Sequence, residues 1–251
     1  MKIWRFLETD KLSGSLNMAI DEALLDSYIQ NNTPSVLRLY TWQNPTLSIG
    51  RNQKIEEINT AKCQEMNIDI VRRPTGGKAV LHQGEITYSI ISGKKDDMPN
   101  EIFNSYLEIS KALIYSLKKL KDSLDFSIGD EPSSKYFDNS FCFASSTVSD
   151  LNYQGKKFVG SAQLRRNNSF LQHGSILINQ DYSNLNEIFN NKTNDLVNLD
   201  DILGFNTSYQ MIKNCILEGF KEFFKIKLND DYLSKYEESL AKSYCSKYKK
   251  L

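Results

Sequence analysis

Apolar residues recur at helical or strand-like spacing along most of the chain, and polar turns separate these segments. Residues 15–30 place apolar side chains on one helical face, which predicts an amphipathic helix with Ser15 as its N-cap. A second helical stripe runs through residues 101–121, and a short helix is predicted for 58–67. Strand-like composition is found in residues 35–42, 46–50, 68–73 and 85–92.

The second half of the chain changes character twice. Residues 122–140 are polar and irregular, which predicts a long loop. Residues 142–179 have the pattern strand–turn–strand–turn–strand, and the pattern is helical from Tyr182 onward. No repeat or linker interrupts the sequence. We therefore predict a single α+β domain over residues 1–251, with a mixed or antiparallel sheet flanked by helices and a mainly helical C-terminal part at about 182–251.

Composition narrows the class of protein. Lys and Arg total 31, as do Asp and Glu, and this zero net charge argues against a general nucleic-acid binder. The N-terminus has no apolar segment of the signal-peptide kind, and no apolar run approaches the roughly 18 residues that span a bilayer. The four cysteines are widely spaced, which fits reduced thiols in the cytoplasm and neither a disulfide framework nor a zinc site.

The stretch Arg72-Arg-Pro-Thr-Gly-Gly-Lys-Ala-Val-Leu-His82 is the most unusual part of the sequence. Paired glycines after a strand allow a sharp turn and a close approach of the backbone to a ligand. Free N–H groups in such a turn can hold a carbonyl or phosphate oxygen. Arg72 and Arg73 should alternate in direction, so that one can face a ligand anion and the other the surface. A hairpin turn with solvated arginines explains the same residues equally well.

Three further residues are candidates for chemistry. Lys157 follows a tight turn and precedes small residues, although an exposed hairpin lysine is the commoner case. Cys142 lies at a loop–strand junction among small hydroxyl residues, although most single cysteines are inert and buried. His173 lies between a strand and a glycine and can line a site, although a histidine with locally satisfied nitrogens is the more frequent case.

Taken together, the segments 72–82, 156–163 and 171–178 resemble, in this order, the signature of the lipoate–protein ligase/octanoyltransferase superfamily. Biotin–protein ligases are more distant relatives. The resemblance runs over about three-quarters of the chain and implies a biotin/lipoate ligase-like catalytic domain. Each segment alone is weak, whereas three in order are specific.

Cys142 selects a branch of this superfamily. Its setting, Cys-Phe-Ala-Ser-Ser-Thr-Val-Ser-Asp-Leu, is similar to that of the octanoyltransferases that modify the glycine cleavage H protein. The resemblance implies a catalytic Cys142 that carries an acyl thioester and an invariant Lys157 that stabilises its thiolate. It implies a substrate-binding role for a set of residues from all three segments, namely Arg72, Arg73, Thr75, Gly76, Gly77, His82, Gly160, Ser161, Ala162, His173 and Gly174.

The implied reaction moves octanoyl from acyl carrier protein to a lysine of the H protein or another lipoyl-domain protein. It needs no cofactor, because the thioester donor is already activated. We expect a monomer that binds neither nucleic acid nor membrane. The alternatives are an ATP-dependent lipoate ligase, which would use ATP and Mg²⁺, an amidotransferase between lipoyl-domain proteins, and a non-catalytic carrier-protein binding module.

Overall fold

The protein is described by a computed structural model over residues 1–128, 150–183, 185–189 and 196–248. Its larger sheet is mixed, in the order β11-β1-β2-β6-β10-β9-β8-β7. Strand β1 is parallel to both of its neighbours, β11 and β2, whereas the other pairs are antiparallel. The strands are β1 (Lys2–Leu12), β2 (Val36–Trp42), β6 (Glu85–Gly93), β7 (Phe126–Ile128), β8 (Leu151–Tyr153), β9 (Lys156–Arg166), β10 (Ser169–Leu177) and β11 (Ile226–Asp230).

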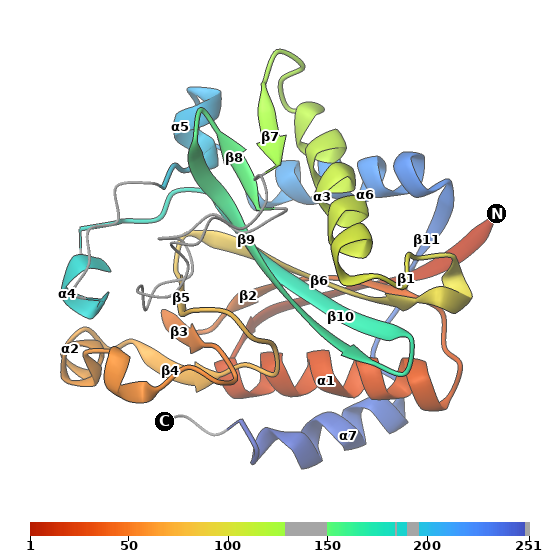
Figure 1. Ribbon diagram of the computed structural model, residues 1–251, viewed down its shortest axis with the longest axis horizontal. Helices are drawn as coiled ribbons and strands as arrows, with labels where there is room; N and C mark the ends of the chain where they lie inside the picture. The colour runs from red at the N-terminus through yellow and green to blue at the C-terminus, as the bar shows by residue number, and fades with distance from the viewer. Residues whose placement is uncertain (129–149, 184, 190–195, 249–251) are drawn as a thin grey trace.

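A smaller sheet of three strands lies beside the larger one (Figure 1). Its order is β4-β3-β5, with β3 (Thr46–Ile49) parallel to β4 (Asp69–Arg72) and antiparallel to β5 (Val80–His82). Short helices α2 (Thr60–Glu65) and α4 (Leu185–Phe189) pack with it around a separate apolar cluster. The glycine turn is the connection between β4 and β5, so this small sheet fixes both of its ends.

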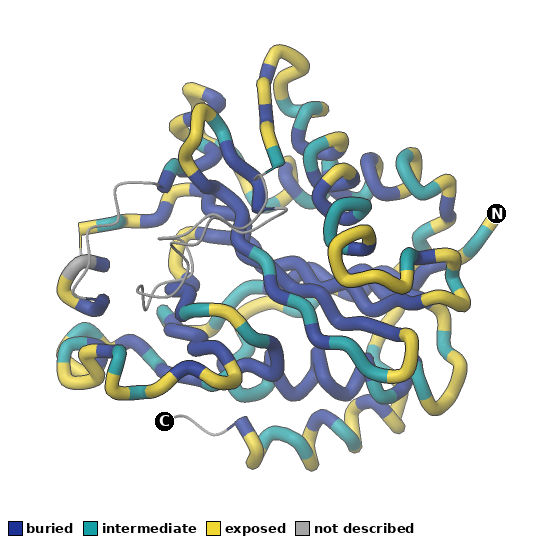
Figure 2. Tube along the Cα trace, in the orientation of Figure 1, coloured by how far each residue is buried: buried dark blue, intermediate teal, exposed yellow. Residues whose placement is uncertain are grey.

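Helix α1 (Gly14–Gln30) is buried on more than one side. It packs against β2, β6 and β10 on one face and against α7 (Lys235–Cys245) on another. Figure 2 shows α1 mostly buried, with the exposed positions of this layer on α7. The expectation of an amphipathic helix was therefore wrong, because α7 covers the face that would otherwise meet water. The N-cap is Ser13, whose side chain accepts from the Leu16 N–H, and not Ser15.

Helices α3 (Ile102–Lys118) and α6 (Tyr209–Phe224) cover the opposite face of the larger sheet, with short helix α5 (Leu199–Leu203) beside them (Figure 1). The largest apolar cluster lies between these helices and β1, β2 and β6. Two 3₁₀ turns, η1 (Ile55–Glu57) and η2 (Lys94–Asp96), complete the described elements. The α+β prediction, with mixed strands flanked by helices, is confirmed.

Four strands were not predicted from the pattern, namely β1, β5, β7 and β11. β7 interrupts the expected loop at 122–140, of which residues 129–140 lie outside the part of the chain described. β11 interrupts the C-terminal part expected to be mainly helical, and it pairs with β1, which was also missed. Among the residues described, no helix has the length and apolar character needed to cross a membrane.

Candidate active site

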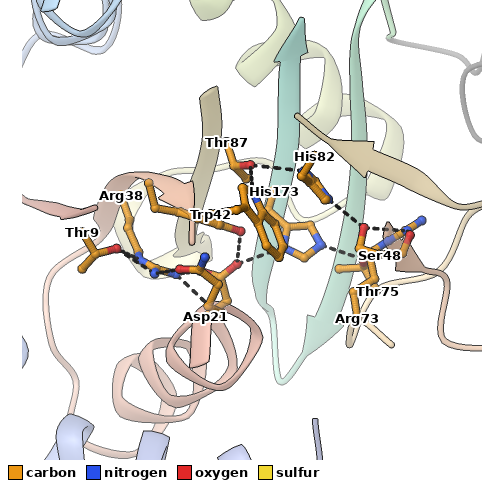
Figure 3. A network of polar contacts seen from close by, with 12 residues as sticks. Thr9, Asp21, Arg38, Trp42, Ser48, Arg73, Thr75, His82, Thr87 and His173 are labelled. Atoms are coloured by element: carbon orange, nitrogen blue, oxygen red, sulfur yellow. Dashed lines mark hydrogen bonds and ion pairs between the residues drawn. The ribbon is translucent and has the colours of Figure 1, made fainter. Parts of the chain in front are cut away.

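A narrow pocket opens between the two sheets and the side of α1 (Figure 3 shows its polar part). The small residues in the middle of β9 and of β10 form one wall, and β2, β3 and β5 form the other. Aromatic and aliphatic side chains alternate with histidine, arginine and hydroxyl groups around it. The lining residues are Met18, Tyr40, Trp42, Ser48, Arg73, Val80, His82, Thr87, Gly160, Ser161, Ala162, His173, Gly174 and Ser175.

His173 is buried in this pocket, and both of its ring nitrogens are hydrogen-bonded. Its Nδ1 lies 2.9 Å from Asp21 Oδ2, and its Nε2 lies 2.7 Å from Thr75 Oγ1. The expectation of a histidine with satisfied nitrogens is confirmed. The same ring also lines the pocket, so His173 is both a histidine with satisfied nitrogens and part of the site wall.

The carboxylate of Asp21 is held by a buried arginine. Arg38 Nη1 donates to Asp21 Oδ1 at 2.6 Å, and both side chains are fully buried. The Tyr40 hydroxyl donates to Asp21 Oδ2 at 3.0 Å. Burial by itself would raise the pKa of Asp21, but Arg38 and the bond from His173 outweigh it and hold that pKa below its ordinary value. Asp21 is therefore an anion inside the core.

His82 occupies the other side of the pocket, stacked on Trp42 with ring centroids 4.0 Å apart. Its Nε2 lies 2.8 Å from Ser48 Oγ, and its Nδ1 faces Thr87 and Glu85 at 3.5 and 3.6 Å. Burial lowers the pKa of His82, and the Glu85 carboxylate only partly offsets that effect. The ring is therefore neutral at pH 7.

Both arginines of the glycine turn hold backbone carbonyls. Arg73 is buried and donates to the carbonyls of Ser48, Gly76 and Lys78, at 2.8, 2.6 and 2.7 Å. Half-buried Arg72 donates to three carbonyls between residues 50 and 53. Neither is the solvated arginine of a plain hairpin turn. Arg73 lines the pocket and Arg72 does not, in keeping with the expected alternation.

The turn itself is closely packed on its small-sheet side. A Cβ at Gly50 would lie 1.8 Å from the carbonyl oxygen of Gly77, so the two loops touch through backbone alone. Gly77 has a φ of 87°, which disfavours any residue with a side chain. Gly76 is different, because a Cβ there would meet no atom within 4 Å. Gly76 therefore faces open space, while Gly77 is needed for the shape of the turn.

The β9–β10 wall depends on small residues. A Cβ at Gly174 would lie 2.6 Å from Ser161 Oγ and 2.7 Å from both Gly160 O and a ring carbon of Tyr88. The Tyr88 hydroxyl in turn lies 2.6 Å from Ser161 Oγ. Ala162 is the residue paired with His173 across the two strands. The four small residues expected at the site thus form one continuous wall.

Lys157 lies at the start of β9 and is only 2% exposed. Its Nζ is 2.6 Å from Asp150 Oδ2, and that carboxylate is equally buried. Lys156 is exposed, so the two neighbouring lysines point in opposite directions, as successive residues of a strand do. The interpretation as an exposed hairpin lysine was wrong for Lys157. Lys157 is not among the residues that line the pocket, and Cys142 lies outside the described residues.

The three described cysteines, Cys63, Cys215 and Cys245, are free thiols. Burial raises the pKa of Cys63 to about 11. Burial, helped by Glu218, also raises the pKa of Cys215. Cys63 and Cys215 are thus thiols rather than thiolates at pH 7. Within the described ranges, no three His, Cys, Asp or Glu side chains are grouped so that they could hold a metal ion.

Several residues in and around the pocket were not foreseen from the sequence. Asp21, Arg38 and Tyr40 form the support of His173, and Ser48 and Trp42 form that of His82. One signal was present: Asn17 and Asp21 are polar residues inside the most apolar part of the segment predicted to be a helix. Buried polar groups require partners, so they point to a polar network in the core.

Comparison with known proteins identifies the family of this chain. The model of the lipoyl protein ligase A/B catalytic domain family matches residues 13–221. The octanoyltransferase LipM of Carboxydothermus hydrogenoformans is 37% identical, over 96% of this chain and 94% of its own. LipM of Clostridioides difficile is 35% identical, over 99% and 97% of the two chains. A lipoate-protein ligase A bound with ATP superposes with a TM-score of 0.83 at 27% identity, over 98% of this chain and 94% of that one.

Fold and relatives together define an acyltransferase enzyme. More specifically, the chain belongs to the lipoyl protein ligase A/B catalytic domain family, as the sequence motifs indicated. Lipoyl-domain proteins are the substrates that membership of this family implies.

Proposed function

We propose that the protein transfers an octanoyl group from acyl carrier protein to a lysine of a lipoyl-domain protein, with the glycine cleavage H protein as the preferred acceptor. The observation that carries this proposal is the similarity, over nearly the whole chain, to proteins named octanoyltransferase. The pocket supports it, because apolar side chains and a wall of small residues suit an alkyl chain.

The proposed reaction has two steps. In the first, the Cys142 thiolate attacks the carbonyl carbon of the octanoyl thioester, and the carrier leaves as its own thiolate, which takes up a proton. In the second, a lysine amine of the acceptor attacks the octanoyl–Cys142 thioester. An amide forms, the Cys142 sulfur leaves, and the amine loses a proton. A covalent intermediate divides one transfer into two easier steps and needs no nucleotide.

Lys157 supplies the cation for this chemistry. A buried ammonium near a thiol favours the thiolate, which is the nucleophilic form. Lys157 is fixed by the Asp150 carboxylate at 2.6 Å, so its amine cannot move freely to the surface. The same amine is a proton donor for the departing carrier thiolate.

The glycine turn supplies the polar contacts to the acyl carbonyl. Gly76 faces open space, so a ligand can approach its backbone without meeting a side chain. Backbone N–H groups in the turn would then stabilise the oxyanion of each tetrahedral intermediate. Arg73 holds the turn in place through three carbonyl oxygens.

The second candidate function is an ATP-dependent lipoate ligase. The similarity to the lipoate-protein ligase A bound with ATP favours it, because the same fold accommodates a nucleotide there. That reaction would require ATP and Mg²⁺ and would leave Cys142 without a covalent role. ATP/pyrophosphate exchange with free lipoate separates the two candidates.

The deciding experiment is the intact mass of the protein after incubation with octanoyl-acyl carrier protein. We expect one added octanoyl group, removed by hydroxylamine and absent in Cys142→Ala. The matched variants Cys63→Ala, Cys215→Ala and Cys245→Ala should keep the adduct. An adduct that persists in Cys142→Ala, or that never forms while ATP supports transfer from lipoate, contradicts the proposal.

A further inference from the structure

The hydrogen bonds around His173 form a chain whose direction can be deduced. At one end, Asp21 Oδ1 accepts from Arg38 and Oδ2 accepts from Tyr40. An ionised carboxylate is an acceptor only, so the Nδ1 atom of His173, 2.9 Å from Oδ2, must carry a proton. In a neutral ring the Nε2 atom is then an acceptor.

The other end of the chain is compatible with this assignment. Arg73 Nε donates to Thr75 Oγ1 at 3.1 Å, and a guanidinium cannot accept. The hydroxyl proton of Thr75 is therefore available for His173 Nε2, at 2.7 Å. Figure 3 shows the resulting line of side chains from Arg38 through Asp21, His173 and Thr75 to Arg73. The Asp21 end thus assigns the proton of His173 to Nδ1, and the Thr75 hydroxyl can donate to the bare Nε2.

Thr75 connects this chain to the glycine turn. It lies between Arg73 and Gly76, and its side chain is fully buried. Because Thr75 does not line the pocket, it is unsuited to be a nucleophile in spite of its histidine and carboxylate partners. Its bond to His173 instead joins the turn to β10, which is otherwise distant in the sequence.

We propose that Asp21, clamped by Arg38, is a positioning residue that keeps His173 in the Nδ1–H form, so that Nε2 anchors Thr75 and with it the glycine turn. The consequence of this arrangement for catalysis rests on the proposed octanoyl transfer, in which the glycine turn contacts the acyl carbonyl. The tautomer itself does not depend on the identity of the substrate.

Asp21→Asn gives a directional test. Arg38 requires an oxygen at the Oδ1 position, so the amide nitrogen of the new side chain must take the Oδ2 position. There it presents N–H to His173 Nδ1, which must now accept. The proton moves to Nε2, so the Thr75 hydroxyl loses its acceptor there and must instead accept a second hydrogen bond beside the one from Arg73. The substitution therefore reverses the tautomer and the direction of the hydrogen bond that anchors the turn.

The chain has only two histidines, so ¹⁵N-histidine NMR resolves the ring of His173 once His82→Gln has assigned the other signals. We expect a protonated Nδ1 and a bare Nε2 in the wild-type protein, and the reverse in Asp21→Asn. A wild-type ring with its proton on Nε2, or a tautomer that Asp21→Asn leaves unchanged, overturns the proposal.

A second pair of variants keeps the proposal testable if Asp21→Asn does not fold. Thr75→Val keeps the shape and removes the hydroxyl, whereas Thr75→Ser keeps the hydroxyl. We expect Thr75→Val to lower kcat for octanoyl transfer about tenfold, with little change in KM, and Thr75→Ser to restore it. Ser89 is the matched control, because it pairs with His173 from β6 and its buried hydroxyl has no hydrogen-bond partner among the residues described.

Equal kcat values for Thr75→Val and the wild type contradict the anchoring role, as does an equal loss in Ser89→Ala. A wild-type protein that transfers octanoyl from no donor refutes the proposed function instead. In that case the NMR measurement still decides the tautomer.

Discussion

Arg38→Met should be among the most destabilising single substitutions in the protein. Arg38 and Asp21 are both fully buried, with nitrogen and oxygen 2.6 Å apart. At an effective dielectric constant of about 20, their attraction is about 6 kcal/mol before the cost of burial. Removing one partner of such a pair typically costs about 3–5 kcal/mol, because the remaining charge stays buried. In a domain of this size that corresponds to a melting temperature lower by roughly 6–20 °C.

The pH dependence of this loss tests its cause. The pKa of Asp21 is depressed in the folded protein, so its stabilising effect is present above the pKa of the unfolded chain and is lost as the pH falls through the folded pKa. Without Arg38, burial dominates and raises the pKa of Asp21 instead. A protonated Asp21 needs no cation. The difference in unfolding free energy between wild type and Arg38→Met should therefore shrink from pH 7 to pH 4.

Urea denaturation followed by circular dichroism measures this difference. Lys111→Met is the control, since it removes an exposed ion pair with Glu108 and should cost less than about 1 kcal/mol. Arg38→Lys keeps the charge but not the fork that also donates to Thr9 and Asn17, so its loss should be intermediate. A loss below about 1 kcal/mol in Arg38→Met, or one that grows toward pH 4, refutes the reasoning.

Three other predictions concern the proposed reaction and the pocket wall. Lys157 should lower the pKa of the Cys142 thiol by about 1–3 units. Alkylation of that thiol at neutral pH should therefore slow about tenfold or more in Lys157→Ala and stay unchanged in Lys156→Ala. Overlapping pH profiles for the two lysine variants would exclude the pairing of Lys157 with Cys142. Transfer from octanoyl-acyl carrier protein should proceed in nucleotide-free buffer with EDTA, and an absolute need for ATP would favour the ligase. Gly174→Ala should cost about 1–3 kcal/mol in stability, because the new methyl group would press on Ser161 and Tyr88. Gly76→Ala should keep the stability measured by urea denaturation but lower the transfer activity. Equal stabilities for the two glycine variants would contradict the packing argument.

Helix α3 could be predicted because its single apolar stripe reflects one covered face. The strands β6 and β10 are buried along their whole length and were recognised by their apolar, strand-like composition rather than by alternation. β11 is short and half-exposed, and among the described strands it pairs with β1, which lies more than 200 residues away in the sequence. No local pattern encodes a pairing of that kind.

The site was predictable to the extent that its residues lie in contiguous motifs. The glycine turn, the small residues of β9 and the histidine of β10 each stand in a contiguous motif, and the fold brings the turn to the same pocket as the distant β9 and β10. Asp21 and Arg38 lie in no recognisable motif, because each is a polar residue within a largely apolar segment. Their roles follow only from the packing of α1 across β2, which brings the two side chains together. A buried carboxylate requires both a cation and donors within reach. Arg38 and Tyr40 on one strand and His173 on another meet that requirement at Asp21, so the support of the histidine follows from packing rather than from sequence proximity.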